Sequence, residues 1–175
     1  MLHQNAFNRN VQVIYPYLNL SYAVIAWGSA YKTQKLQSKQ NTVLRIMFFA
    51  TTSGPYTESA LPFLNLLDIL TVDNFYHLHS LKFTHMCHEG FLPKVSDNLF
   101  QYAKSQHTYN TRQNFCKPCI RTNAGKLMFS FKATDLWQYI PLYLKDLSTF
   151  SFAKEVKQYL LSKQYSLELL KAFLK

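Results

Sequence analysis

The sequence is poor in the residue types that build several common sites. Only 4 glycines and 3 cysteines occur among its 175 residues. So few glycines argue against a phosphate-binding glycine loop, and nothing resembles the Gly-x-Ser-x-Gly turn of many hydrolases. Three cysteines are too few for a disulfide scaffold, and no N-terminal segment resembles a signal peptide. We therefore expect an intracellular protein, in the nucleus or the cytoplasm.

Long hydrophobic runs are also scarce. The most apolar stretch, residues 11–27, is at the short limit for a transmembrane helix, and Gln12, Pro16, Asn19 and Ser21 interrupt it. We interpret it as buried helix and expect no membrane partner. The chain is 48% hydrophobic and 16% aromatic, which is enough for a packed core in one domain or two small subdomains.

Acidic residues are the most unevenly distributed group. The chain has 9 Asp and Glu against 19 Lys and Arg, a formal charge of +10, and residues 1–57 and 98–134 contain no acid at all. The cations of these two stretches are Arg9, Lys32, Lys35, Lys39 and Arg45 in the first and Lys104, Arg112, Lys117, Arg121, Lys126 and Lys132 in the second. Segregated positive charge is typical of proteins that bind a polyanion, because each cation near a phosphate releases condensed counterions. A surface that only aids solubility is the alternative.

The apolar periodicity predicts a mainly α fold. We expect a helical region over residues 1–103 and a C-terminal extension over residues 104–175, with a basic extended segment or small β-hairpin before the terminal helices. Extended structure is predicted at 108–111 and 127–131. The predicted helices are 7–27, kinked at Pro16 and ended by Gly28, then 33–49, 57–65, 71–89, 95–102, 133–139, 150–161 and 166–174.

Two groups of side chains stand out on these helices. Lys32, Lys35 and Lys39 line one face of the predicted helix over 33–49, away from its apolar residues. Trp27 and Trp137 lie near helix ends, where a large ring most often anchors the core rather than stacking on a nucleobase.

A Cys-x-x-Cys motif, Cys116-Lys117-Pro118-Cys119, lies inside the second acid-free stretch. It is half of a zinc site. A second pair would have to come from the preceding helix, where His85 and His88 stand three residues apart among His77, His79, His85, Cys87 and His88. The spacing between the two pairs matches no zinc pattern, so a small zinc-stabilised nucleic-acid module remains an alternative. A redox role is less favoured because the motif lacks the strand-to-helix setting that lowers a thiol pKa. We expect no cofactor and two incidental cysteines in a basic segment.

Short motifs follow one another along the chain in a fixed order. They are Ile14-Tyr15-Pro16-Tyr17-Leu18, Ala26-Trp27-Gly28, Lys35-Leu36-Gln37-Ser38-Lys39-Gln40, Leu44-Arg45-Ile46, Tyr109-Asn110-Thr111-Arg112, Arg121-Thr122-Asn123, Phe129-Ser130-Phe131, Asp135-Leu136-Trp137 and Ile140-Pro141. Through this ordered series, over residues 8–162, the chain resembles the region after the polymerase palm in reverse transcriptases of non-LTR retrotransposons (LINE-like and Jockey-like elements).

The resemblance implies a helical thumb that closes over the primer-template duplex, followed by a C-terminal extension. It implies RNA or an RNA–DNA hybrid as ligand, and the palm and fingers of a parent RNA-directed DNA polymerase as partners. Polymerisation needs a pair of metal-binding aspartates, and no two acidic residues are adjacent in this chain. We therefore expect a non-catalytic fragment of a longer protein, or the remnant of a decayed element, and not an enzyme.

The expected contacts with nucleic acid come from both basic stretches. Cations would bind phosphate, and Tyr109 or Phe115 would stack on an unpaired base. The full set is Lys32, Lys35, Lys39, Arg45, Tyr109, Arg112, Lys117, Arg121 and Lys126. The alternative from another class is a stand-alone helical protein-interaction module, derived from a decayed retroelement, whose aromatic surface binds a protein.

Overall fold

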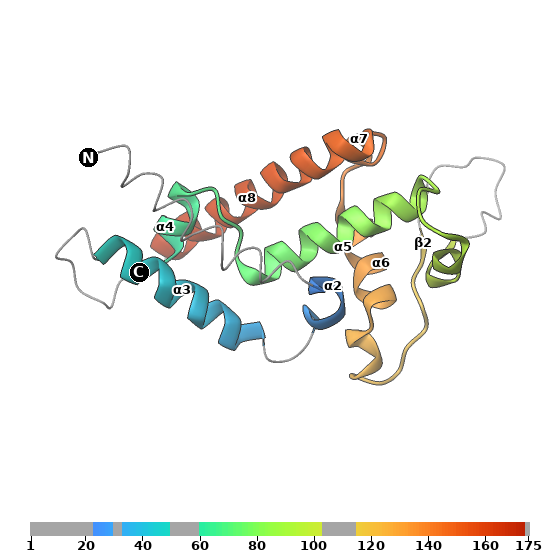
Figure 1. The fold of residues 1–175 in the computed structure, drawn as a ribbon, viewed down its shortest axis with the longest axis horizontal. Coiled ribbons are helices and arrows are strands. Elements are labelled where there is room, and N and C mark those ends of the chain that lie inside the picture. The colour runs from blue at the N-terminus through green and yellow to red at the C-terminus, as the bar shows by residue number, and fades with distance from the viewer. Residues whose placement is uncertain (1–22, 30–32, 50–59, 103–114, 174–175) are drawn as a thin grey trace. The chain divides into compact units, whose positions relative to one another are not determined.

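The computed structural model describes residues 23–29, 33–49, 60–102 and 115–173, and these are mainly helical, as predicted (Figure 1). The α-helices are α2 (Val24–Trp27), α3 (Thr33–Phe49), α4 (Leu61–Leu66), α5 (Val72–His88), α6 (Phe129–Tyr139), α7 (Leu142–Lys145) and α8 (Thr149–Phe173). The short 3-10 helices η1 (Lys94–Leu99) and η2 (Gly125–Leu127) and the strands β1 (Gln101–Tyr102) and β2 (Phe115–Cys116) complete the described elements. None of the helices in these ranges is both long and apolar enough to cross a membrane.

The chain divides into two compact units. Unit 1 comprises residues 1–73 and 161–175, and unit 2 comprises residues 74–160. The division therefore passes through α5 and α8, whereas the boundary suggested by the sequence, between residues 103 and 104, lies inside unit 2.

Two of the long helices predicted before residue 90, at 33–49 and 71–89, are confirmed. α3 spans the residues expected of it and contains no glycine or proline to interrupt it. α5 ends where Gly90 takes a left-handed conformation, with φ of 72°. There the amide of Phe91 donates to the carbonyl of Met86 at 3.0 Å and that of Gly90 to Cys87 at 3.2 Å, a Schellman cap that satisfies carbonyls of the last turn.

Two predictions for the C-terminal part are wrong. Residues 127–131 are not extended, because α6 begins at Phe129 and carries Ala133 and Trp137 into the core on one helical face. The helices expected at 150–161 and 166–174 are one helix, α8. No glycine or proline separates them, and the residues between them include Gln164, which is buried.

Other predicted segments are confirmed only in part. Residues 57–65 contribute α4, which begins at Leu61 with Pro62 in its first turn, where a missing amide proton costs little. Residues 95–102 form η1 and then β1 in place of one helix. Residues 7–22 and 108–111 lie outside the described part of the chain.

The described core of unit 1 is a small apolar cluster tied by amide side chains. Leu44, Leu64 and Ile69 are buried together, with Leu61 against them. The segment that leads into α5 is held by three glutamines whose amides bond its backbone. Gln37 Oε1 accepts from Val72 N at 2.8 Å, Gln40 Nε2 donates to Leu70 O at 3.0 Å, and Gln164 Oε1 accepts from Thr71 N at 3.2 Å. Gln164 Nε2 also donates to Asn65 Oδ1 at 2.9 Å.

Unit 2 has an aromatic core around Trp137, which is fully buried, as predicted; Trp27 in unit 1 is only half-buried. The centre of the Phe115 ring lies 5.9 Å from the centre of the Trp137 ring and 4.9 Å from the centre of the Phe100 ring. β1 and β2 pair antiparallel, with Gln101 opposite Cys116 and Tyr102 opposite Phe115. This pairing anchors the Cys-x-x-Cys segment to the core through Phe115 and leaves Cys116 at the surface.

Candidate nucleic-acid interface

The basic face of α3 is fixed by the contacts of its opposite face. Leu44 is buried, and Gln37 and Gln40 bond the backbone of residues 70 and 72, so the helix cannot rotate without breaking both bonds. Lys35 and Lys39, one turn apart, are exposed. Neither forms an ion pair with another residue in the described ranges. Both ammonium groups therefore remain available to phosphate.

The other cations predicted at this face differ from these two lysines. Arg45 is half-buried and takes part in an interaction within the chain. Lys32 lies outside the described residues. The structure therefore brings together two of the four predicted contacts of the first basic stretch on an exposed face.

The second basic stretch is described only after residue 114, so Tyr109 and Arg112 lie outside it. Arg121 and Lys126 are exposed and, among the described residues, make no ion pair. Lys117 pairs with Asp135, and its Nζ lies 4.5 Å from the centre of the Phe131 ring. The charge of Lys117 is therefore partly neutralised, whereas Arg121 and Lys126 keep their positive charge unpaired among the described residues.

The turn that carries Arg121 and Lys126 requires a glycine. A Cβ atom on Gly125 would lie 2.3 Å from Ile120 Cγ2 and 3.0 Å from Thr122 Oγ1. The amide of Gly125 also donates to Thr122 Oγ1 at 3.1 Å, which closes the turn. This close approach fixes the path of the backbone between the two cations.

The prediction that Phe115 could stack on an unpaired base is wrong. Its side chain is 2% exposed, and Phe100, Trp137 and His88 surround its ring. Stacking on a base needs an open ring face, which Phe115 lacks.

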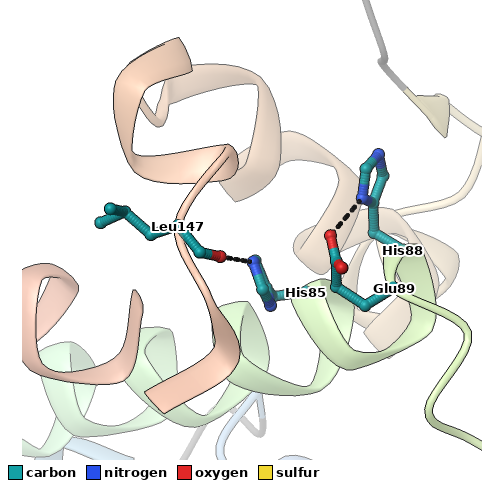
Figure 2. Close-up of polar contacts among 4 residues, drawn as sticks. All are labelled: His85, His88, Glu89 and Leu147. Carbon is teal, nitrogen blue, oxygen red and sulfur yellow. Dashed lines mark hydrogen bonds and ion pairs between the residues drawn. The ribbon is translucent and has the colours of Figure 1, made fainter. Parts of the chain in front are cut away.

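The structure does not bring the four zinc candidates together. His85 is buried and stacks on Phe152, and its Nε2 donates to Leu147 O at 3.0 Å, whereas His88 Nδ1 lies 3.4 Å from Glu89 Oε1. Figure 2 shows the two rings pointing in different directions. Cys116 and Cys119 are exposed. Within the described ranges, no three His, Cys, Asp or Glu side chains gather as metal ligands.

Among the described residues of unit 2, His85 carries a fully buried titratable ring. Burial lowers its pKa below the ordinary value of 6.5, and this effect outweighs the opposite influence of Glu89. Since Nε2 donates its proton to Leu147 O, the neutral ring carries no proton on Nδ1, which has no hydrogen-bond partner in the described part of the chain. His85 is therefore a neutral core residue and not a proton donor to a ligand.

Lys145, in α7, also lies in the core. Its side chain is buried, with Nζ 5.1 Å from the centre of the Trp137 ring. Burial lowers the pKa of Lys145, against the opposing effect of Asp146. The cation–π contact keeps the amine in place, and so Lys145 is not part of the exposed basic surface.

A cavity of about 340 Å³ beside the β1–β2 pair brings together residues that the sequence did not connect. Asn98 and Gln101 come from η1 and β1, Cys116 and Cys119 from β2 and the segment after it, and Ser130 from α6. Neutral polar residues on separate segments carry no periodic or compositional signal, and only the fold places them around one space.

Comparisons of the chain with protein-family models, with curated proteins and with solved structures found no match.

Proposed function

We propose that this chain is a non-catalytic, thumb-like and post-thumb region of a non-LTR retrotransposon RNA-directed DNA polymerase that contacts the backbone of RNA or of an RNA–DNA hybrid. The observation that supports it most is the availability of its cations. Lys35 and Lys39 on α3, and Arg121 and Lys126 on the second basic stretch, are exposed and form no ion pair within the described ranges. Each can therefore neutralise a phosphate.

The role we propose is positioning and not chemistry. Lysine and arginine contacts to phosphate hold a duplex in register but carry no sequence information. With no adjacent pair of acids in the chain, the metal-binding aspartates would come from a palm elsewhere in the parent polymerase, as would the fingers.

The test is binding of the full chain to a labelled RNA–DNA hybrid at several salt concentrations. Four neutralised phosphates predict that affinity falls roughly 100-fold between about 50 and about 200 mM salt. Absence of binding at low salt, from a sample with intact helical circular dichroism, would falsify the proposal.

A helical protein-interaction module is the second candidate, and exposed apolar side chains favour it. Tyr139, Leu142, Tyr143 and Phe150 are all exposed in unit 2, around α7. Surface of this kind binds protein partners by burying apolar area, which high salt does not weaken. Capture of a partner that persists at high salt, together with no binding to the hybrid, would favour this candidate.

The zinc-stabilised module is tested by metal analysis. If zinc holds Cys116 and Cys119, chelation should release it and reduce the helical signal. No zinc and no loss of helix after chelation would eliminate this alternative.

A further inference from the structure

The cavity beside the β1–β2 pair has the size of a small-ligand site. At about 340 Å³, it lies at the lower end of the roughly 300 to 1,000 Å³ typical of such sites. A single nucleobase is small enough for this space. Asn98, Gln101 and Ser130 give its wall polar character, and Leu99 and Pro118 give it apolar character. Gln101 lies opposite Cys116 in the strand pair, and Cys119 also lines the space.

The polar groups of the wall suit the edge of a base. The side chains of Asn98, Gln101 and Ser130 make no hydrogen bond with any other described residue, so their capacity is open to a ligand. Each carboxamide offers both donors and an acceptor. Asn and Gln are the side chains that pair with base edges through two hydrogen bonds. No carboxylate among the described residues lines the cavity.

Cations lie on the segment that joins two residues of the wall. Cys119 and Ser130 both line the cavity, and the segment between them carries the exposed Arg121 and Lys126. Lys117 lies in the wall itself, paired with Asp135. The site therefore combines uncharged hydrogen-bonding groups inside with positive charge on the segment that joins two parts of its wall.

We propose that this cavity receives one unpaired nucleobase, held at its edge by the side-chain amides of Asn98 and Gln101, while Arg121 and Lys126 bind the adjoining phosphate. The inference rests on the proposed function and deepens it, because it adds a site for a single-stranded base to the contacts with backbone. It also takes the place of stacking on Phe115, whose ring is buried.

The two thiols in the wall report occupancy directly. Cys116 and Cys119 are exposed and should react with iodoacetamide, and Cys87, on α5 outside the cavity wall, serves as an internal control. Nucleoside monophosphates of the four bases are the first probe and inorganic phosphate is the second. At a monophosphate concentration about ten times its Kd, alkylation of both wall thiols should slow about tenfold and that of Cys87 should not change.

A single-stranded oligonucleotide and its abasic counterpart separate a base within a strand from a free nucleotide. The intact strand should protect Cys116 and Cys119, and the abasic strand should not. If only free monophosphates protect, the cavity is a nucleotide site and the part of the inference that concerns a strand is wrong. Equal protection by inorganic phosphate or by the abasic strand would show that no base is recognised and would overturn the inference.

Substitution of the amides tests their role. Asn98→Ala or Gln101→Ala should raise the Kd for the preferred monophosphate about fivefold, as expected for loss of one neutral hydrogen bond. Gln138→Ala removes an exposed amide of α6 that does not line the cavity, and it should leave the Kd unchanged. Unchanged affinity in both wall variants, each with intact helical signal, would contradict the proposed recognition.

Failure of this inference and failure of the proposed function have different signatures. The RNA–DNA hybrid has no unpaired base, so its salt-dependent binding tests the backbone contacts alone. Hybrid binding without protection of the thiols by any base-containing probe would leave the proposed function in place and overturn the cavity. Protection by monophosphates without hybrid binding would leave the cavity in place and overturn the proposed function.

Discussion

At the residue scale, hydrogen-bonded amides and buried rings contribute more to the packing of this protein than its charged side chains do. Gln37, Gln40 and Gln164 satisfy backbone groups around the start of α5, and His85 occupies the core of unit 2 in neutral form. A buried polar group is tolerated because it is hydrogen-bonded. Removing its partner leaves the group buried without a hydrogen bond, which lowers the free energy of unfolding. Substitutions at these positions should therefore act on folding before they act on binding.

The titration of His85 gives a prediction about pH. Burial lowers the pKa of His85 below 6.5, so the unfolded chain binds a proton there more tightly than the folded chain does. The stability that depends on neutral His85 is complete above pH 6.5 and is lost as the pH falls through the lowered pKa. His85→Gln keeps an amide donor for Leu147 O and cannot titrate, so it should reduce this loss.

The measurement is the free energy of unfolding in urea at about pH 7.5 and at about pH 5.5. Burial and Lys82 also lower the pKa of His79, so His79→Gln is the matched control and should remove a separate part of the pH dependence. Should His85→Gln and the original protein lose the same stability on acidification, His85 does not titrate as described.

At the element scale, prediction from sequence succeeded where local pattern decides. α3 and α5 follow from their apolar periodicity and from Gly90, which ends α5. The same reasoning split α8 in error. Gln164 lies in the predicted gap, and it is buried and bonded to residues almost 100 positions earlier, such as Asn65. The sequence predicted a small hairpin in this region but not its strands, because the pairing of β1 with β2, which buries Phe115 beside the cavity, is likewise non-local.

The basic face of α3 gives a prediction at this scale. Lys35→Glu with Lys39→Glu should weaken binding to all nucleic acid sequences and reduce the slope of log K against log salt by about 2, one for each phosphate contact. Adding Lys32→Glu should weaken binding further. Filter binding or fluorescence anisotropy across a salt series measures both quantities.

Lys94→Glu with Lys154→Glu is the control for α3. It changes the formal charge by the same amount, at exposed lysines outside the acid-free stretches. If the two double variants lose affinity equally, net charge and not the face of α3 determines binding.

At the scale of the whole molecule, the surface is as unusual in its apolar side chains as in its charge. Tyr139, Leu142, Tyr143 and Phe150 are exposed within residues 139–150, and Phe150 is 86% exposed. Exposed apolar side chains close together in a chain mark a surface that is normally covered.

We therefore expect the isolated chain to self-associate or to be only marginally stable. Phe150→Ser should reduce association, measured by analytical ultracentrifugation, because it removes the most exposed of these side chains. Phe91→Ser, at an exposed apolar side chain beyond the end of α5, should have little effect. A monomer that melts in one sharp transition without any substitution would contradict the expectation.

The division of the chain into two units also bears on the order in which a ribosome would deliver them. Unit 2 is one continuous stretch, residues 74–160, whereas unit 1 joins residues 1–73 to residues 161–175. During synthesis the aromatic core around Trp137 can therefore form first. In unit 1, Asn65 and Thr71 cannot form their hydrogen bonds to Gln164 until that residue has left the ribosome. A nascent chain halted before that point would carry a finished second unit and an unfinished first one, the form most exposed to chaperones and proteases.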